Sequence, residues 1–404
     1  MAAASVTMSR YEAFVARKRE HILRALDDAC QATGLSGLDD FELEHEALPD
    51  IDLDEVTLAS RLLGQPAPTP FYVAGMTAGH PDAAKINRLL ARACERRGWA
   101  MGVGSQRRQL SATRADAELD QWAQLRAEAP ALVLFGNIGL SQIIGTPIHY
   151  LQDLVTSIRA QALAVHLNPL QECMQPEGTP QFRGGRAALQ ALCAELGVPV
   201  VLKETGCGFS ARTLRSLEGI GLAAVDVSGL GGTHWGRIEG ARAANTPGAG
   251  MQAQAAETFR NWGVSTAQSV IHARSTLPRV ECWASGGVRS GLDAAKLIAL
   301  GAERVGYARP ALEAALAGEE VLDRWMAQQE HELRIALFCS GCIDPASLRL
   351  RHAAMMANTY FTWRRHSRER GNPEGFCFSK SGSLAGMTQG TRLRQARGFP
   401  RSRE

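Results

Sequence analysis

The 404-residue sequence lacks the long apolar runs and the targeting features that would place it at a membrane or outside the cell. No apolar run approaches the roughly 20 residues that a bilayer-spanning helix requires. The first residues, MAAASVTMSRYEAF, have no charged segment followed by an apolar stretch, as a secretory signal would. We therefore expect a cytoplasmic protein without a membrane partner.

The sequence also lacks the cysteine pattern of a disulfide framework or a zinc site. It has nine cysteines, an odd number, scattered through segments of helical and strand character. The single CxxC, Cys339 to Cys342, has neither a second pair nor a thioredoxin-like strand before it. We interpret the cysteines as ordinary thiols in a reducing compartment.

Strong net charge is absent as well, since the whole chain carries only +3. The segment from Arg364 to Glu404 has ten Arg and Lys against three Asp and Glu, a local charge of +7, so the residues before it carry −4. This segment is nearly free of Ile, Val and Leu, which predicts a basic, disordered low-complexity tail. A nucleic-acid-binding arm is the alternative, but no aromatic or helical periodicity supports it, and we expect no nucleic-acid partner.

What the sequence does contain is a repeated alternation of apolar runs and helical segments. Helical periodicity is clear at 81–98, 150–161, 183–197 and 290–303, and an N-terminal amphipathic helix is predicted at 10–31. Near-continuous apolar strands alternating with helices predict an α/β fold, a (β/α)8 barrel in one domain over residues 1–363, with an open doubly wound sheet as the alternative. The long segment 236–262 is expected to include a loop over the barrel mouth. The eight apolar runs are FYVAGM (71–76), AMGVGS (100–105), ALVLFGN (131–137), ALAVHLN (162–168), VPVVLKE (198–204), AAVDVS (223–228), VECWASGG (280–287) and RVGYARP (304–310).

Polar residues collect where these predicted strands end, and in a barrel this end carries the chemistry. After the last two strands, SGGVRSG (285–291) and GYARP (306–310) are typical of a phosphate site built from backbone N–H groups and a helix N-terminus. By contrast, SGLGGT (228–233) lacks the GxGxxG spacing of a dinucleotide site. The ligand could be a sugar phosphate, a nucleotide or flavin mononucleotide (FMN), and Lys203 suits flavin because a cation near the ring N1 stabilises its anionic reduced form.

Several motifs together resemble type 2 isopentenyl diphosphate isomerase, a flavin-dependent family, over roughly residues 10–360. The combination of HLNPLQE with VGSQR is highly specific for this family. The phosphate motifs Gly286-Gly287 and Ala308-Arg309 are shared with other flavin-binding barrels. The motifs are RKREHI (17–22), MTAG (76–79), MGVGSQR (101–107), GNIG (136–139), HLNPLQECMQPEG (166–178), FRG (182–184), VPVVLKETGCGFS (198–210), DVSGLGGTHW (226–235) and the stretch from ASGGVRSG to GYARP (284–310).

The resemblance implies interconversion of isopentenyl and dimethylallyl diphosphate by a 1,3-allylic proton shift. It implies FMN that must be reduced, although the reaction has no net redox change, and whose N5 exchanges a proton with the alkene. It further implies Mg²⁺ and NADPH or NADH, which only reduces the flavin. We expect a homo-oligomer, a tetramer or an octamer.

The resemblance also assigns site residues, position by position. From the helix pattern alone, Arg17 and Lys18 would be interpreted as part of a solvent-exposed helix face. The resemblance reverses that interpretation and assigns them to the site. Two departures from the family pattern place Ala78, Leu230 and His234 beside the cofactor. Flavin contacts are assigned to Met76, Thr77, Ala78, Ser105, Asn137, Lys203, Ser228 and Thr233, and the flavin phosphate to Gly286, Gly287, Val288, Arg289, Ala308 and Arg309. Substrate contacts are assigned to Arg17, Lys18, Ser105, Gln106, Arg107, His166, Asn168 and Gln171.

The chemistry of the HLNPLQE stretch fits a diphosphate. His166 and Asn168 lie two residues apart, on one side of the strand end, and can donate to phosphate. The Glu172 carboxylate suits Mg²⁺, with waters and phosphate oxygens completing an octahedron. Gln171 is neutral at every working pH and could orient or relay a proton, so we expect Gln171, His166 and Asn168 to form the catalytic group.

Two other functions remain as alternatives. An FMN-dependent barrel oxidoreductase acting on a 2-hydroxy acid would use a His base with an Arg late in the barrel. The sequence offers for this only His272 and Arg274, in helix-like sequence. A non-catalytic flavin-binding redox sensor would need neither Gln171 nor Glu172.

Overall fold

The computed structural model describes residues 10–77, 82–110 and 117–358. The chain divides into two compact units, Met1–Met355 and Met356–Glu404, and the barrel strands all belong to the first. The tail predicted for residues 364–404, the domain boundary at 363 and the flavin contact Ala78 lie outside the described residues.

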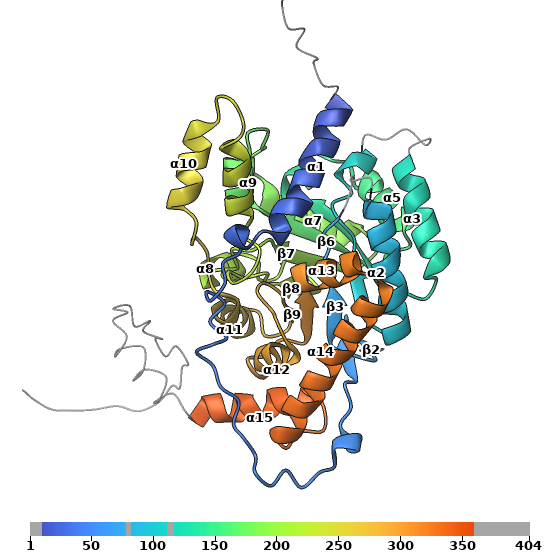
Figure 1. Ribbon diagram of the computed structural model, residues 1–404, viewed down its shortest axis with the longest axis vertical. Coiled ribbons are helices and arrows are strands. Elements are labelled where there is room, and N and C mark those ends of the chain that lie inside the picture. Colours follow the sequence, from blue (N-terminus) through green and yellow to red (C-terminus); the bar gives the residue numbers. More distant parts are fainter. Residues whose placement is uncertain (1–9, 78–81, 111–116, 359–404) are drawn as a thin grey trace, which may run out of the picture. The chain divides into compact units, whose positions relative to one another are not determined.

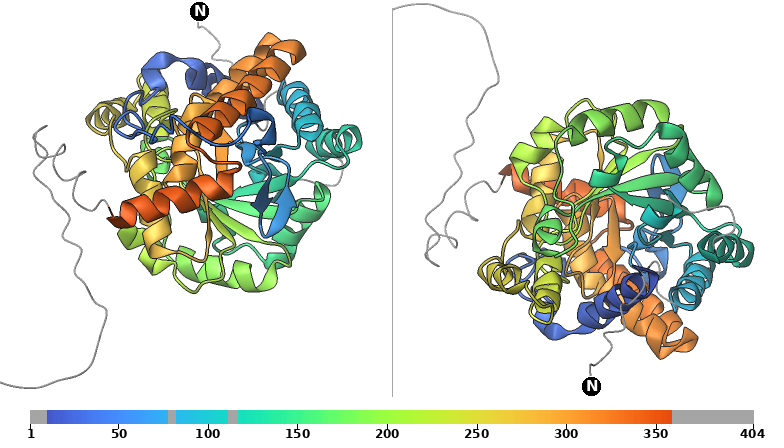
Figure 2. Two further views of the ribbon diagram at one scale, coloured as in Figure 1. Left: turned by 90° about the horizontal axis from the view of Figure 1, so that it is seen from below. Right: turned by 90° about the horizontal axis from the view of Figure 1, so that it is seen from above.

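Eight parallel strands close into a barrel, in the order β10-β3-β4-β5-β6-β7-β8-β9. Each strand overlaps one of the eight predicted apolar runs, so the barrel prediction is confirmed and the open-sheet alternative is wrong. Val305 lies beside Phe71 where the last strand pairs with the first, and helices surround the strands (Figure 1, Figure 2). The strands are β3 Phe71–Val73, β4 Ala100–Gly102, β5 Leu134–Gly139, β6 Ala162–Leu167, β7 Val200–Glu204, β8 Ala224–Asp226, β9 Glu281–Ala284 and β10 Arg304–Tyr307.

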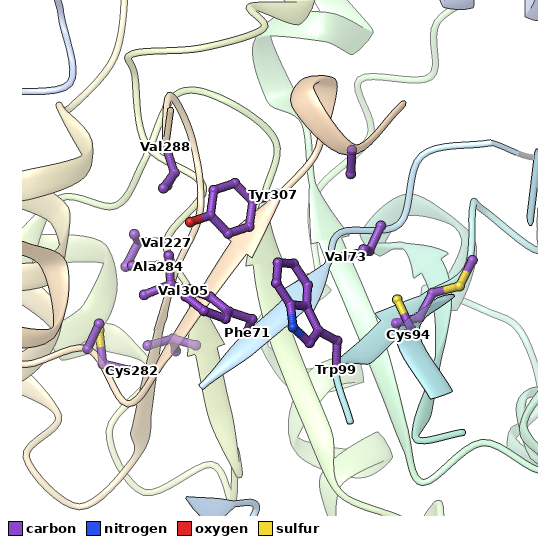
Figure 3. Close-up of a cluster of buried hydrophobic side chains, with 14 of the residues drawn as sticks. Phe71, Val73, Cys94, Trp99, Val227, Cys282, Ala284, Val288, Val305 and Tyr307 are labelled. Carbon is purple, nitrogen blue, oxygen red and sulfur yellow. The ribbon is translucent and has the colours of Figure 1, made fainter. Parts of the chain in front are cut away.

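Alternate residues of each strand pack inside and outside the barrel, as the two-residue period of a strand requires. Inside, Tyr72, Phe135 and Trp283 form one cluster with small alanines, and the Trp283 ring lies 5.4 Å from Tyr72 and 4.9 Å from Phe135, centroid to centroid. Outside, Phe71 and Tyr307 pack on the helix layer with Trp99 and other residues drawn in Figure 3. The aromatic filling makes the barrel interior a packed core.

A hairpin that the sequence analysis did not predict lies beside the amino ends of the barrel strands. It comprises β1 Ser60–Leu62 and β2 Gln65–Ala67, and its Leu62 and Ala67 join the interior cluster. Arg304, fully buried at the start of β10, donates to Thr69 O at 2.7 Å and to Ser60 Oγ at 3.1 Å. The hairpin therefore covers this end of the barrel, and active sites of such barrels lie at the other, carboxyl end.

Local signals account for where the helices begin and end. The Ser290 hydroxyl caps α12 by accepting from Asp293 N at 3.1 Å, and Gly98 ends α2 in the left-handed conformation, φ +68°. The helices are α1 Arg10–Leu26, α2 Ala83–Arg97, α3 Ala117–Glu128, α4 Leu140–Ile143, α5 Ile148–Ser157, α6 Pro169–Met174, α7 Gly185–Glu195, α8 Ala211–Ser216, α9 Trp235–Ala243, α10 Gly250–Thr258, α11 Thr266–Thr276, α12 Gly291–Ala299, α13 Arg309–Ala317, α14 Glu319–Cys339 and α15 Pro345–Asn358, with 3-10 turns η1 Asp28–Cys30, η2 Leu53–Glu55 and η3 Arg107–Leu110.

The predicted helices are confirmed by α1, α2, α5, α7 and α12. The segment 236–262, which was expected to include a loop, forms most of α9 and all of α10, with a non-helical stretch at 244–249 between them. The two helices pack against each other. In the described part of the chain, no helix combines the length and the apolar character needed to cross a membrane. The eight cysteines of that part are free thiols.

Candidate active site

The end of β6 presents the polar cluster predicted from HLNPLQE. Pro169 takes the first position of α6, where its missing N–H costs no helical hydrogen bond. This turn brings the Asn168 amide within reach of two side chains: Nδ2 donates to Gln171 Oε1 at 3.1 Å and to Glu172 Oε1 at 2.8 Å. His166 Nδ1 lies 2.9 Å from Asn137 Oδ1, on the neighbouring strand β5.

Glu172 is buried, and protein donors already hold both of its carboxylate oxygens. Oε1 accepts from Asn168, and Oε2 accepts from Thr179 N at 2.7 Å. No three His, Cys, Asp or Glu side chains gather as a metal site within the described residues. One fixed carboxylate nevertheless fits Mg²⁺, which commonly takes one or two protein carboxylates and completes its octahedron with waters and substrate phosphates.

The positive charges of residues from three separate elements act on His166. Burial, and then the positive charges of Lys18, Lys203 and Arg107, lower the pKa of His166 to about 3. The imidazole is therefore neutral at working pH. Lys18 comes from α1, Lys203 from β7 and Arg107 from η3, so the fold concentrates positive charge from distant parts of the sequence where an anion would bind.

A carboxylate that the sequence analysis missed lies behind Gln171. Glu239 of α9 is fully buried, and it accepts from Gln171 Nε2 at 3.3 Å and lies 2.9 Å from His21 Nε2. It also pairs with Arg242. Burial alone would raise the pKa of Glu239, but His21 and Arg242 outweigh it and hold the pKa below its ordinary value. The sequence contains one weak indication of this carboxylate: Glu239 and Arg242 lie three positions apart, a spacing that allows an ion pair within one helix.

The N-terminal helix is tied to this cluster by ion pairs. Arg17 Nη1 lies 2.9 Å from Glu177 Oε1, in the loop after α6, and Arg242 Nη2 lies 3.1 Å from the same oxygen. Arg242 Nε also pairs with Glu20 at 3.3 Å. These ion pairs hold the RKREHI motif against α9 and the loop after α6, and the site role of Arg17 and Lys18 stays a prediction.

Two glycine loops pack backbone to backbone after β8 and β9. Gly286 and Gly287 have φ values of +101° and +74°. A Cβ on Gly286 would lie 2.2 Å from Gly229 O, and one on Gly287 would lie 2.4 Å from Gly231 C, so side chains are excluded at both positions. No acceptor in the described part of the chain receives the N–H of Gly287 or Val288. Backbone donors of this kind fit a flavin phosphate.

The two arginines assigned to that phosphate have other partners in the structure. Arg289 pairs with Asp39 at 2.6 Å and with Asp293 at 2.8 Å. Arg309 pairs with Asp28 at 2.7 Å and with Glu313 at 2.7 Å. Both guanidinium charges are thus compensated by carboxylates, and the backbone donors are the stronger candidates for the phosphate site.

Gln106, a predicted substrate contact, makes its hydrogen bonds to protein groups in this structure. Its side chain is fully buried. Nε2 donates to Leu154 O at 3.1 Å and to Gln109 Oε1 at 3.0 Å, while Oε1 accepts from Asn137 N at 3.0 Å. These contacts fix the loop that carries the half-exposed Ser105 and the exposed Arg107.

The remaining predicted flavin contacts lie at strand ends around the mouth. Thr77 is buried and hydrogen-bonded to Asn87, and Met76 beside it is half-buried. Ser228 has a left-handed φ of +35°, rare for a residue with a side chain. Thr233 Oγ1 donates to Gln31 Oε1 at 3.1 Å, which joins the loop after β8 to the segment following α1.

Known proteins resemble this chain in fold and in sequence. A family model described as FMN-dependent dehydrogenase matches residues 170–355. Solved structures named lactate oxidase from Pediococcus acidilactici (TM-score 0.56, 16% identity, 86% of this chain and 94% of that one) and a mandelate oxidase variant with benzaldehyde (TM-score 0.55, 18% identity, 84% and 96%) share the fold. At such identities the likeness concerns the fold alone.

Sequence similarity to curated proteins is much higher. A protein of Legionella pneumophila (strain Lens) named isopentenyl-diphosphate delta-isomerase is 51% identical over 83% of this chain and 96% of its own length. Proteins of the same name from Bdellovibrio bacteriovorus and Synechococcus are 49% and 42% identical, over 81% and 82% of this chain and 94% of their own lengths. Because this identity extends over most of both chains, the protein belongs to the isopentenyl-diphosphate delta-isomerase family.

Proposed function

We propose that this protein interconverts isopentenyl and dimethylallyl diphosphate by a 1,3-allylic proton shift. The single observation that carries the proposal is the convergence of Lys18, Arg107 and Lys203 on His166, beside a fixed carboxylate and a neutral amide. A site of this composition combines diphosphate binding with proton transfer on an uncharged group. The relatives named as isomerases support the same reaction.

The diphosphate would be bound by charge and by a metal. Lys18 and Arg107 would neutralise its oxygens. The neutral His166 donates its Nδ1–H to Asn137 Oδ1, so its Nε2 carries no proton and can accept from a protonated phosphate oxygen or a water. Glu172, held by Asn168 and Thr179, would be the protein ligand of Mg²⁺. The Asn168 amide bonds both Glu172 and Gln171, so one side chain sets the spacing between the metal ligand and the group beside the alkene.

Gln171 would handle the proton on the protein side of the substrate. Its amide presents no charge to an apolar alkene, and its Nε2 donates to the buried Glu239. An anionic Glu239 fixes the orientation of that amide and favours any transient positive charge on it. Water exclusion would come from α1, whose ion pairs with the loop after α6 and with α9 cover this side of the mouth.

The glycine loops would hold the phosphate of FMN, and Lys203 would supply a positive charge to its ring. When bound and reduced, FMN supplies a second acid–base group without net electron transfer. NADPH or NADH would only keep it reduced. We further propose cytoplasmic location and assembly as a homo-oligomer, a tetramer or an octamer, both from the family resemblance.

The oxidoreductase alternative is weakened by the positions of its two candidate residues. His272 and Arg274 lie on α11, outside the barrel mouth. His272 Nδ1 lies 3.0 Å from Phe209 O, and Arg274 pairs with Glu303 at 3.0 Å. Neither is available as a base or a carboxylate clamp for a 2-hydroxy acid. A non-catalytic redox sensor would require neither the hydrogen bond between Gln171 and Glu239 nor the fixed Glu172 carboxylate.

The test is an anaerobic reaction of the FMN-loaded protein with isopentenyl diphosphate and Mg²⁺, started by one equivalent of dithionite. We expect many turnovers to dimethylallyl diphosphate for each equivalent of reductant, without NADPH. Reductant consumption in proportion to product, or bleaching of the flavin by a 2-hydroxy acid, would establish the oxidoreductase instead. A flavin that bleaches without forming product would indicate a sensor.

A further inference from the structure

Lys203 and Asp226 form a buried ion pair on the floor of the barrel mouth. They are directly opposite each other on neighbouring strands, β7 and β8. Lys203 Nζ lies 2.7 Å from Asp226 Oδ2, and the two side chains are 12% and 2% exposed. Burial at this depth makes the interaction much stronger than that of a surface pair, because the surroundings screen charge poorly.

The Asp226 carboxylate has a complete set of partners that fixes its orientation. Its second oxygen, Oδ1, accepts from Ser285 Oγ at 2.7 Å and from Ser228 N at 3.3 Å. Ser285 Oγ also lies 3.4 Å from Lys203 Nζ. Asp226 thereby links the lysine to the beginnings of both glycine loops, since Ser228 precedes Gly229 and Ser285 precedes Gly286. An ammonium has three donors, so one remains for a ligand.

The pair faces an apolar space inside the barrel. A cavity of about 20 Å³ adjoins it, in which Lys203 and Asp226 are the charged lining residues. The Tyr72 hydroxyl, also at this cavity, has no hydrogen bond of normal geometry within the described structure. Burial, and then the charge of Asp226, raise the pKa of Tyr72 well above its ordinary value. The other lining residues are Ala74, Gly75, Gly102, Val103, Phe135, Gly136, Asn137, Ala164, Val201 and Trp283.

We infer that Asp226 is a positioning residue that holds the Lys203 ammonium under the flavin ring and moderates its charge. This inference rests on the proposed binding of FMN. With Asp226 ionised, the lysine charge is shared between the carboxylate and the ligand, so the ring is stabilised as an anion only in part. Removal of the carboxylate charge would leave the lysine charge to the flavin alone.

Sulfite is a direct probe of this effect, because it adds to oxidised flavin at N5 and leaves negative charge on the ring. In Asp226→Asn, which keeps the side-chain shape, we expect the sulfite dissociation constant of the FMN-loaded protein to fall by about tenfold. Lys203→Gln should raise it instead. In the Lys203→Gln background, Asp226→Asn should have little further effect, because Asp226 acts through the lysine.

Ser285→Ala is the matched control, since it removes a neutral donor to the same carboxylate and leaves both charges in place. We expect it to change sulfite binding by less than about twofold. Two results would overturn the inference: Asp226→Asn with the sulfite affinity of the parent, or a tenfold effect that persists without Lys203. The second would mean that the carboxylate acts on the ring directly.

A second measurement needs no flavin and keeps the inference testable if Asp226→Asn folds poorly. Each single substitution leaves one buried charge without its partner, whereas Asp226→Asn with Lys203→Gln leaves none. In urea unfolding of the FMN-free protein, the double variant should be more stable than the sum of the single effects predicts. Strict additivity would show that the pair is not coupled. Failure of the unsubstituted protein to bind FMN would contradict the proposed function and not this coupling.

Discussion

The amide of Gln171 donates a hydrogen bond to the buried carboxylate of Glu239, with 3.3 Å between Nε2 and Oε1. This contact joins α6, which follows β6, to α9, which follows β8, across the barrel mouth. It gives the neutral Gln171 side chain a fixed orientation. In the proposed mechanism the two nearby carboxylates have different roles: Glu172 would hold Mg²⁺, and Glu239 would orient Gln171.

Gln171→Ala should therefore impair the chemical step and spare binding. The substitution removes the amide and leaves Asn168, Glu172 and the cations around His166 in place. We expect turnover to fall about 10²-fold or more, the scale of one general acid–base contributor, with little change in KM. Deuterium uptake from solvent into recovered substrate measures proton transfer independently. Normal exchange in the variant would mean that Gln171 is a loop residue and that another group transfers the proton.

Glu172→Gln should act mainly through the metal. The substitution removes the charge that attracts Mg²⁺, and its new NH₂ faces donors at Asn168 or Thr179. We expect the Mg²⁺ concentration for half-maximal activity to rise at least about tenfold, with partial recovery of turnover at high Mg²⁺. Glu172→Asp, which keeps the charge, is the control. Loss of turnover that no Mg²⁺ concentration restores would assign Glu172 to another role.

The architecture was predictable because it depends on short-range pattern. Each barrel strand overlaps an apolar run, and parallel strands bring their following residues to one end. This is how His166, Lys203 and Ser228, widely separated in sequence, could be placed around one mouth. The common direction of the strands and the two-residue period of side chains along a strand are sufficient for this placement.

The partners of those residues could not be predicted in this way. Glu239 lies in a helical stretch without a motif, and its contacts with His21 and Gln171 depend on how α1 and α6 pack on α9. In the same way, the pairs of Arg289 with Asp39 and of Arg309 with Asp28 join residues 250 and 281 positions apart, and only their i, i+4 pairs with Asp293 and Glu313 could be read from the sequence. Long-range pairing of side chains depends on tertiary packing, which hydrophobic periodicity does not encode.

Arg126 offers a test of what stabilises the barrel away from the site. It is 4% exposed and donates to backbone carbonyls, among them Leu132 O at 2.7 Å and Ile158 O at 3.0 Å. Burial lowers the pKa of Arg126 below its ordinary value. We expect Arg126→Met to lower the free energy of unfolding by about 3 kcal/mol, since it leaves buried carbonyls unpaired. Surface Arg186→Met is the control, and equal effects in urea unfolding would refute the assignment.

The pH dependence of stability tests the environment of His166. Burial and the charges of Lys18, Lys203 and Arg107 lower its pKa to about 3 in the folded protein, against about 6.5 when unfolded. Because the folded-state pKa is the lower one, the unfolded chain takes up the proton first. The contribution of His166 to stability is therefore complete above pH 6.5 and is lost progressively as the pH falls toward 3.

His166→Gln, which cannot titrate, provides the comparison. Between pH 7.5 and pH 5 the unsubstituted protein should lose about 2 kcal/mol more of its unfolding free energy than the variant does. Inorganic pyrophosphate should reduce that difference, because an anion bound among the same cations raises the pKa of the imidazole. Urea unfolding at the two pH values, with and without pyrophosphate, measures both effects. Parallel losses in the two proteins would mean that His166 titrates normally, and that the cations do not converge on it.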